Sequence, residues 1–267
     1  MNLDEYSSLD GVALGELIAN KEILPTEVAQ LAKNAAEDVE NHLNASVEIF
    51  ETPISRTTQS STPLTGVPMF LKDILATIEG VKQECGSRLL NGAVSETTSH
   101  FSRRILDAGL QVIGRSACPE FGLTLTTESI AEGITRNPWN LNKIAGGSSG
   151  GSAALVAAGV VPVAHTNDGG GSTRVPASAC GNLGLKTSRG LVSLGPRLND
   201  VLAPLVSEGC NSRTVRDTAA FLDIVSGAES GDAVITAKPE RQFLSQHNIS
   251  PKALRIAVCR QSLFGNI

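Results

Sequence analysis

Two short glycine-rich stretches each carry a serine, and together they are the part of the sequence best suited to chemistry. The first, residues 146–152, reads GGSSGGS and contains Ser148; the second, residues 168–174, reads DGGGSTR and contains Ser172. Successive glycines leave backbone N–H groups uncovered, and such donors can hold an oxyanion that develops during acyl transfer. Either stretch alone is typical of an ordinary turn, so the chemical interpretation depends on their combination.

Lys72 is the third candidate, because a serine hydroxyl needs a base and neither loop contains a histidine. It lies near the end of an apolar run, residues 67–74, while the nearest histidine, His165, falls on the strand expected before the second loop. Burial with little counter-charge lowers the pKa of a lysine and makes the neutral amine available as a base. The carboxylate of Asp73 would oppose this lowering of the pKa if it faced the same side of the strand as Lys72. The alternative is a lysine at a strand end that extends its amine into water.

Three other glycine motifs do not fit these loops. Residues 146–150 and 147–151 match G-x-S-x-G, but that nucleophile elbow follows a strand, and residues 137–144 are predicted to form a loop. No Lys-Ser/Thr pair follows the glycines, as a phosphate-binding loop requires, and both loops lack the dinucleotide pattern G-x-G-x-x-G.

The two loops and their flanks resemble the amidase signature family of amide hydrolases. The resemblance lies in GGSSGGSAA at residues 146–154 and in DGGGSTRVPA at residues 168–177, and it is strongest between residues 66 and 217. It implies an α/β amidase-signature fold, with a mixed central β-sheet flanked by helices on both faces. The expected organisation is one domain, residues 1–267, with its catalytic core at about residues 66–217.

The resemblance also implies roles for individual residues. Ser172 matches the nucleophile of the family, Lys72 matches its catalytic lysine, and Ser148 matches the serine between them, which follows a cis peptide bond. Ser148 would pass the proton of Ser172 to Lys72 and later return it to the leaving amine. The oxyanion hole of the family is built from backbone N–H groups, which here are those of Gly169, Gly170, Gly171 and Ser172.

Charged and polar neighbours of the serines are expected to support the loops. Asp168 and Arg174 flank Ser172 and can hold its loop by charge-assisted hydrogen bonds, and Ser149 can orient the same network. Glu128 and Arg136 are favoured as structural residues that pair with neighbours, with a place in the site as the alternative.

The surrounding sequence alternates strand and helix patterns, which is typical of an α/β layer fold. Apolar residues at spacings of three and four predict a helix over residues 25–44. The other elements predicted are helices at 99–108, 152–158 and 215–225, strands at 67–74, 111–113, 160–165 and 254–258, and a loop at 135–142.

Composition excludes several classes of function. The net charge is −5, from 22 basic and 27 acidic residues, which argues against nucleic-acid binding. The longest apolar stretch, residues 153–164, is too short to span a membrane, and the acidic N-terminus is unlike a signal peptide. Five scattered cysteines and four histidines without metal-binding spacing predict reduced thiols, no metal and no cofactor. A cytoplasmic location is therefore expected.

Members of the resembling family are longer, and the chain is expected to lack their C-terminal part. Three functions follow from the residues and the resemblance: an amidase acting on a small carboxamide, the amidase subunit of a tRNA-dependent amidotransferase, or a non-catalytic truncated remnant. The partners expected are the small-molecule amide and either a homodimer or a polypeptide that supplies the missing C-terminal part. No direct contact with nucleic acid or membrane is expected.

Overall fold

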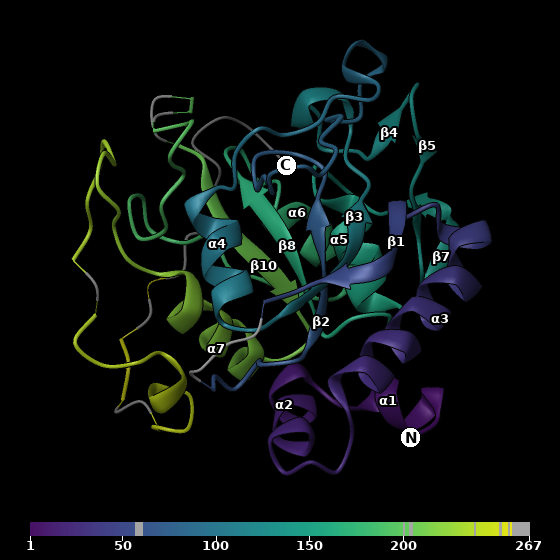
Figure 1. The fold of residues 1–267 in the computed structure, drawn as a ribbon. Coiled ribbons are helices and arrows are strands. Elements are labelled where there is room, and N and C mark those ends of the chain that lie inside the picture. The colour runs from purple at the N-terminus through teal and green to yellow at the C-terminus, as the bar shows by residue number, and fades with distance from the viewer. Residues whose placement is uncertain are drawn as a thin grey trace.

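A six-stranded sheet forms the centre of the molecule (Figure 1). The computed structural model describes residues 1–56, 61–199, 201–202, 205–237, 239–250, 253–255 and 257. The helices are α1 (Leu3–Ser8), α2 (Gly11–Ala19), α3 (Pro25–Leu43), α4 (His100–Asp107), α5 (Gly150–Ala157), α6 (Arg174–Cys180) and α7 (Val215–Val225), with 3-10 turns at Arg88–Leu90, Glu120–Gly122 and Leu244–Gln246. The strands are β1 (Ser46–Ile54), β2 (Pro68–Lys72), β3 (Gln111–Ser116), β4 (Glu128–Ser129), β5 (Gly133–Ile134), β6 (Arg136–Asn137), β7 (Asn140–Ile144), β8 (Val163–Asp168), β9 (Leu183–Gly184) and β10 (Ser207–Ser212).

The sheet is mixed, in the order β1-β3-β2-β8-β10-β9. Strand β2 runs parallel to β3 and β8, whereas β1, β10 and β9 run antiparallel to their neighbours. Helices α5 and α6 pack on one face of the sheet, and α4 and α7 cover the other (Figure 1). The predicted architecture, a mixed sheet with helices on both faces, is confirmed.

The long helices begin and end where their capping residues lie. Helix α3 starts at Pro25, and Asn44 ends it in the left-handed conformation with φ 48°. Ser99 and Thr214 cap α4 and α7, where each side-chain oxygen accepts a backbone N–H of the first turn. These helices confirm the predictions at residues 25–44, 99–108 and 215–225.

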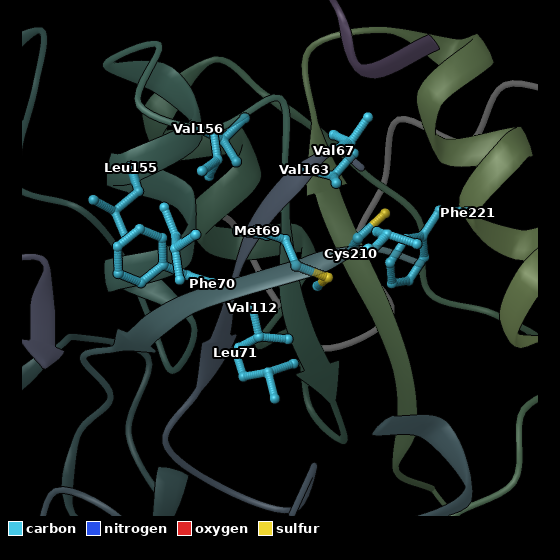
Figure 2. Close-up of a cluster of buried hydrophobic side chains, with 14 of the residues drawn as sticks. Val67, Met69, Phe70, Leu71, Val112, Leu155, Val156, Val163, Cys210 and Phe221 are labelled. Atoms are coloured by element: carbon cyan, nitrogen blue, oxygen red, sulfur yellow. The ribbon is translucent and has the colours of Figure 1, made fainter. Parts of the chain in front are cut away.

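The buried core joins the sheet to the helices on its two faces. Figure 2 shows part of this cluster, in which side chains of the sheet meet those of α5 and α7. Phe70 and Met69 of β2 are fully buried, as are Leu155 of α5 and Phe221 of α7. Burial of a large apolar side chain contributes roughly 1.5–3 kcal/mol, so β2 is a rigid base for the residue at its end.

Several elements differ from the sequence-based expectation. The predicted loop at residues 135–142 contains β6 and most of β7, which pair as an antiparallel two-stranded sheet. The premise used against a nucleophile elbow is therefore wrong, since a strand does precede residues 146–150. That strand is exposed along its whole length and lies outside the six-stranded sheet. Its polar sequence NLNKI lacks the apolar alternation by which half-buried strands are recognised.

The end of the chain is described only in part. Of the strand expected at residues 254–258, Ile256 and Val258 lie outside the described residues, as does Cys259 next to it. Leu254, Arg255 and Ala257 are exposed and are not assigned to a strand.

Candidate active site

Two neighbouring parallel strands bring the candidate residues to one edge of the sheet. Strand β2 ends at Lys72 and strand β8 ends at Asp168, and parallel strands present their carboxyl ends at the same edge. The second glycine loop leaves β8 directly after Asp168 and leads into α6. The first glycine loop leads into α5, which packs on β2 and β8.

Lys72 is buried, and its amine has two polar partners. Lys72 is only 1% exposed. Its Nζ lies 2.7 Å from Ser148 Oγ and 2.7 Å from Asn167 Oδ1. Burial lowers the pKa of Lys72 to about 8, although the nearby carboxylates of Glu208 and Asp168 act in the opposite direction. About half of the amine is therefore neutral near pH 8, and a neutral amine can accept a proton.

The carboxylate of Asp73 is hydrogen bonded on a different side of β2. Its Oδ1 accepts a hydrogen bond of 2.7 Å from Arg115 Nη1, and both carboxylate oxygens accept the backbone N–H of Glu84. Arg115 also donates to the carboxylates of Glu48 and Glu84. The charge next to Lys72 in sequence is thus engaged by Arg115 and not by the lysine.

Ser148 lies on a backbone that is packed tightly against a neighbouring segment. The peptide bond between Gly147 and Ser148 is cis, as the family resemblance implies. A Cβ atom at Gly147 would lie 2.5 Å from the carbonyl oxygen of Thr126, so only glycine fits there without displacement. The packing holds the Ser148 hydroxyl where it meets Lys72.

Ser172 is connected to the first loop through its backbone. Its carbonyl accepts the N–H of Ser149 at 3.2 Å, and the Ser149 hydroxyl lies 3.5 Å from the carbonyl of Asn167. Ser172 is 8% exposed, and in the described part of the chain its hydroxyl makes no hydrogen bond, to Ser148 or to any other residue. The structure therefore brings Lys72 and Ser148 into direct contact and places Ser172 in a loop that is hydrogen bonded to the first.

One of the four expected oxyanion donors is engaged within its own loop. The N–H of Gly171 donates to Asp168 Oδ1 at 2.7 Å, so it supports the loop and is not a free donor. The N–H groups of Gly169, Gly170 and Ser172 have no acceptor among the residues that the structure describes. A Cβ at Gly170 would meet no atom within 4 Å, so open space lies beside this part of the loop.

Asp168 and Arg174 form hydrogen bonds within the second loop through their charged side chains. Arg174 donates through Nε and Nη2 to the two oxygens of Asp168, at 2.8 Å each, and Asp168 also accepts the N–H groups of Gly171 and Thr173. Burial alone would raise the pKa of Asp168, but these hydrogen bonds outweigh it and hold the pKa below its ordinary value. Asp168 therefore stays ionised and keeps the loop closed around its side chain.

Three polar residues behind Lys72 were not singled out by the sequence. Asn167 accepts from the lysine amine, His165 Nδ1 accepts the backbone N–H of Lys72 at 3.1 Å, and His165 Nε2 lies 2.8 Å from Glu208 Oε2. Because Nδ1 is an acceptor, the ring proton lies on Nε2 and is donated to Glu208. The only sequence signal for His165 and Asn167 is that the strand changes from apolar residues at 163–164 to polar residues at 165–168.

An apolar rim, formed by Leu125 and Leu202, borders the second loop. Leu125 lies beside Gly171 and Leu202 lies beside Gly169. These two residues are 47% and 61% exposed. Their position gives the surface beside the second loop an apolar character.

A cavity of about 480 Å³ adjoins the same region through Ile74. Ile74 Cδ1 also lies next to Gly122, and the Ile74 carbonyl accepts the side-chain amide of Asn167. Apolar side chains line much of the cavity, and Gln83, Glu96 and Arg197 add polar groups.

The two remaining predicted residues lie on two-residue strands outside the six-stranded sheet. Glu128 is in β4, and Arg136 of β6 donates to the carbonyl of Leu141 in the hairpin.

Within the described ranges, no cluster of three or more histidine, cysteine or acidic side chains could hold a metal ion. The same ranges contain no helix that combines the length and the apolar character needed to cross a bilayer.

Comparison of the sequence with known proteins identifies similar enzymes. The sequence model of a family described as Amidase matches residues 27–265. The chain is 38% identical over 269 residues to the 6-aminohexanoate-cyclic-dimer hydrolase of Paenarthrobacter ureafaciens, covering 96% of this chain and 53% of that relative. It is 40% identical over 204 residues to a glutamyl-tRNA(Gln) amidotransferase subunit of Deinococcus deserti, covering 76% of this chain and 41% of that relative.

Solved structures agree with the sequence comparison. The structure of 6-aminohexanoate cyclic dimer hydrolase complexed with substrate superposes with a TM-score of 0.85 at 36% identity, covering 92% of this chain and 52% of that one. A bacterial aryl acylamidase of the amidase signature enzymes gives 0.79 at 31% identity, covering 89% and 51%. The chain spans about half the length of the curated relatives it matches.

Proposed function

The chain belongs to the amidase (amidase signature) family, and from this premise we propose that it hydrolyses a carboxamide through an acyl-enzyme on Ser172. One observation carries the proposal. The buried amine of Lys72, with its lowered pKa, lies 2.7 Å from the hydroxyl of Ser148. Ser148 in turn belongs to the loop that is hydrogen bonded to the Ser172 loop.

In the proposed acylation, Ser172 Oγ attacks the amide carbonyl carbon. Its proton passes to Ser148 Oγ, and the proton of Ser148 passes to neutral Lys72 Nζ. The N–H groups of Gly169, Gly170 and Ser172 hold the resulting oxyanion. The C–N bond then breaks, and the leaving nitrogen takes a proton back from Lys72 through Ser148.

Deacylation reverses the path with water as the nucleophile. Water attacks the ester carbonyl of acylated Ser172 and transfers a proton through Ser148 to Lys72. The bond between the carbonyl carbon and Ser172 Oγ then breaks, and Ser172 recovers its proton from the same relay. The product acid is released as its carboxylate.

The proposed substrate is a small amide with an aliphatic acyl group. The apolar rim supports this choice, and so does the partly apolar cavity beside Ile74. A similar protein is named for hydrolysis of the cyclic dimer of 6-aminohexanoate, which is an aliphatic amide. Only 3% of the residues are aromatic, so few side chains could stack on an aromatic substrate.

The test is covalent labelling of Ser172 with a serine-reactive fluorophosphonate, combined with hydrolysis of a panel of aliphatic and aromatic amides. The parent chain is expected to form an adduct on Ser172 and to hydrolyse aliphatic amides, and Ser172→Ala is expected to lose both while it unfolds at an unchanged temperature. Ser188→Ala, at an exposed position, is the matched control. An active Ser172→Ala variant contradicts the proposal, and an unlabelled parent chain identifies a non-catalytic remnant.

The second candidate is the amidase subunit of a tRNA-dependent amidotransferase. It is supported by the 40% identity to the glutamyl-tRNA(Gln) amidotransferase subunit of Deinococcus deserti. Release of ammonia from glutamine, together with co-purification of partner subunits, would favour it over the stand-alone amidase. Hydrolysis of simple amides by the chain alone would favour the first candidate.

We also infer a protein partner and a cytoplasmic location for the chain. The partner is a second copy of the chain or a polypeptide that corresponds to the other half of the relatives, and the chain acts in the cytoplasm. The four described cysteines are all free thiols, which supports a reducing compartment. Sedimentation of the purified chain, and fractionation of the cells that produce it, test these two points.

A further inference from the structure

We propose that Asn167 is a positioning residue that fixes the direction of the Lys72 amine relative to Ser148. This inference rests on the proposed function, because it concerns the same proton relay. Asn167 is buried, at 6% exposure, and lies one residue before the end of β8. Its side chain reaches both the lysine amine and the segment that follows β2.

The orientation of the Asn167 amide is determined by its second partner. Nδ2 donates to the carbonyl of Ile74 at 3.2 Å, and a backbone carbonyl can only accept. Oδ1 must therefore face Lys72 Nζ, which lies 2.7 Å away. Since Ile74 follows Lys72 by two residues, one amide side chain holds both the amine and the backbone just beyond it.

A side-chain amide suits this position because it accepts without a charge. A neutral amine has two N–H bonds and one lone pair in a tetrahedral arrangement. Asn167 Oδ1 takes one N–H, which restricts the directions left for the other N–H and the lone pair, one of which meets Ser148 Oγ at 2.7 Å. A carboxylate would make the same contact but would stabilise the ammonium form, which cannot accept a proton.

The other groups around the amine do not take over this function. The carboxylates of Glu208 from β10 and Asp168 from β8 act on Lys72 by charge, and the thiols of Cys118 and Cys85 lie nearby. His165 contacts the backbone N–H of Lys72 and not the amine. Within the described residues, Ser148 and Asn167 are the only hydrogen-bond partners of Nζ.

The experiment measures the titration of Lys72 directly, by NMR of the full chain with isotopically labelled lysine. Lys72→Met assigns the signal. In Asn167→Asp the midpoint is expected to rise by roughly one to three pH units, because an opposite charge replaces a neutral acceptor. In Asn167→Leu it is expected to fall below that of the parent, because the carbonyl dipole that favours the ammonium is removed. Asn182→Asp, whose amide donates to the carbonyl of Ala153, makes the same chemical change away from Lys72 and is expected to leave the midpoint unchanged.

A second measurement connects the orientation to the relay. Above its own lysine midpoint, Asn167→Leu is expected to react with the fluorophosphonate about 10- to 100-fold more slowly than the parent, because the amine is neutral but misdirected. Unchanged lysine midpoints in both Asn167 variants would overturn the inference, and so would a parent-like labelling rate in Asn167→Leu. An unlabelled parent chain would overturn the proposed function, while the lysine titration would still decide whether Asn167 controls the amine.

Discussion

At the scale of the residue, Lys72 determines how the site depends on pH. The relay needs the neutral amine, and burial lowers the lysine pKa to about 8. The rate of Ser172 acylation is therefore expected to rise about tenfold per pH unit below pH 8 and to level off above it. Fluorophosphonate labelling between pH 6 and pH 10 measures this rate. Lys143→Met, at an exposed position, is the control that keeps the profile, and a rate independent of pH would contradict the assignment of Lys72 as the base.

The same amine is expected to lower the stability of the fold at neutral pH. The unfolded chain binds the lysine proton up to about pH 10.5, whereas the folded chain releases it near pH 8. Stability therefore rises with pH between these values, by at most about 3.5 kcal/mol, since each pKa unit corresponds to about 1.4 kcal/mol.

Lys72→Met removes this dependence, and its effect is measurable by urea unfolding. At pH 7 the variant is expected to be roughly 1–3 kcal/mol more stable than the parent, because the loss of the hydrogen bonds to Ser148 and Asn167 offsets part of the gain. The difference is expected to shrink as the pH rises from 8 to 10.5. A difference that stays constant over this range would show that the amine is not desolvated in the folded state.

At the scale of the element, helix α7 fixes the position of α2. Asp217 of α7 is fully buried, and its two oxygens accept the N–H groups of Gly11 and Val12, at 2.9 Å each. Arg213, just before α7, donates to the carbonyls of Ser7 and Leu9 in the same region. These contacts join residues about 200 positions apart in the chain.

Asp217→Ala is expected to reduce the free energy of unfolding by about 3 kcal/mol. The substitution leaves the first N–H groups of α2 buried without an acceptor and removes two hydrogen bonds to a charged group. Asp38→Ala, at an exposed position of α3, is the control and is expected to change stability by less than about 0.5 kcal/mol. Chemical denaturation measures both, and a loss in Asp217→Ala no larger than in the control would show that α2 is held by packing alone.

Sequence patterns predict the elements whose burial follows a simple period. Helix α3 and helix α7 carry apolar residues at helical spacing between recognisable caps, so their limits are predicted almost to the residue. Strand β10, with the sequence SEGCNS, is buried at every position and has no apolar alternation. Several of its polar groups bond to partners far away in sequence, such as Glu208 with His165, and no local pattern can reveal these contacts.

The residues of the site likewise divide into those that sequence patterns reveal and those that they do not. The glycine loops and Lys72 are recognisable because their types and spacing are unusual, and the family resemblance assigns a role to each. Asn167 is not recognisable in this way, because its contact with Lys72 depends on the pairing of β2 with β8. The hydrogen bond from the Gly171 N–H to Asp168 Oδ1 is likewise not recognisable, because the sequence does not indicate that this carboxylate turns back toward the loop.

At the scale of the whole molecule, the two strands that carry the site are protected from solvent. Strands β2 and β8 are buried at every residue and lie in the middle of the sheet. By contrast, no described residue between 227 and 250 is buried. Amide hydrogen exchange is therefore expected to be slower in β2 and β8 than in the described residues between 227 and 250. Mass spectrometry of peptic fragments measures this order, and rapid exchange in β2 would contradict the position of Lys72 on a rigid strand.

The hydrogen bond from Ser149 to the carbonyl of Ser172 has a consequence for how disturbances reach the two hydroxyl groups. Because this hydrogen bond joins the two glycine loops, a displacement of one loop also displaces the other. The distance between the two loops therefore varies less than their position within the molecule. A substitution far from the two loops would therefore displace both serines together relative to the bound amide. We expect such distant substitutions to raise KM before they slow the transfer of the proton between the serines.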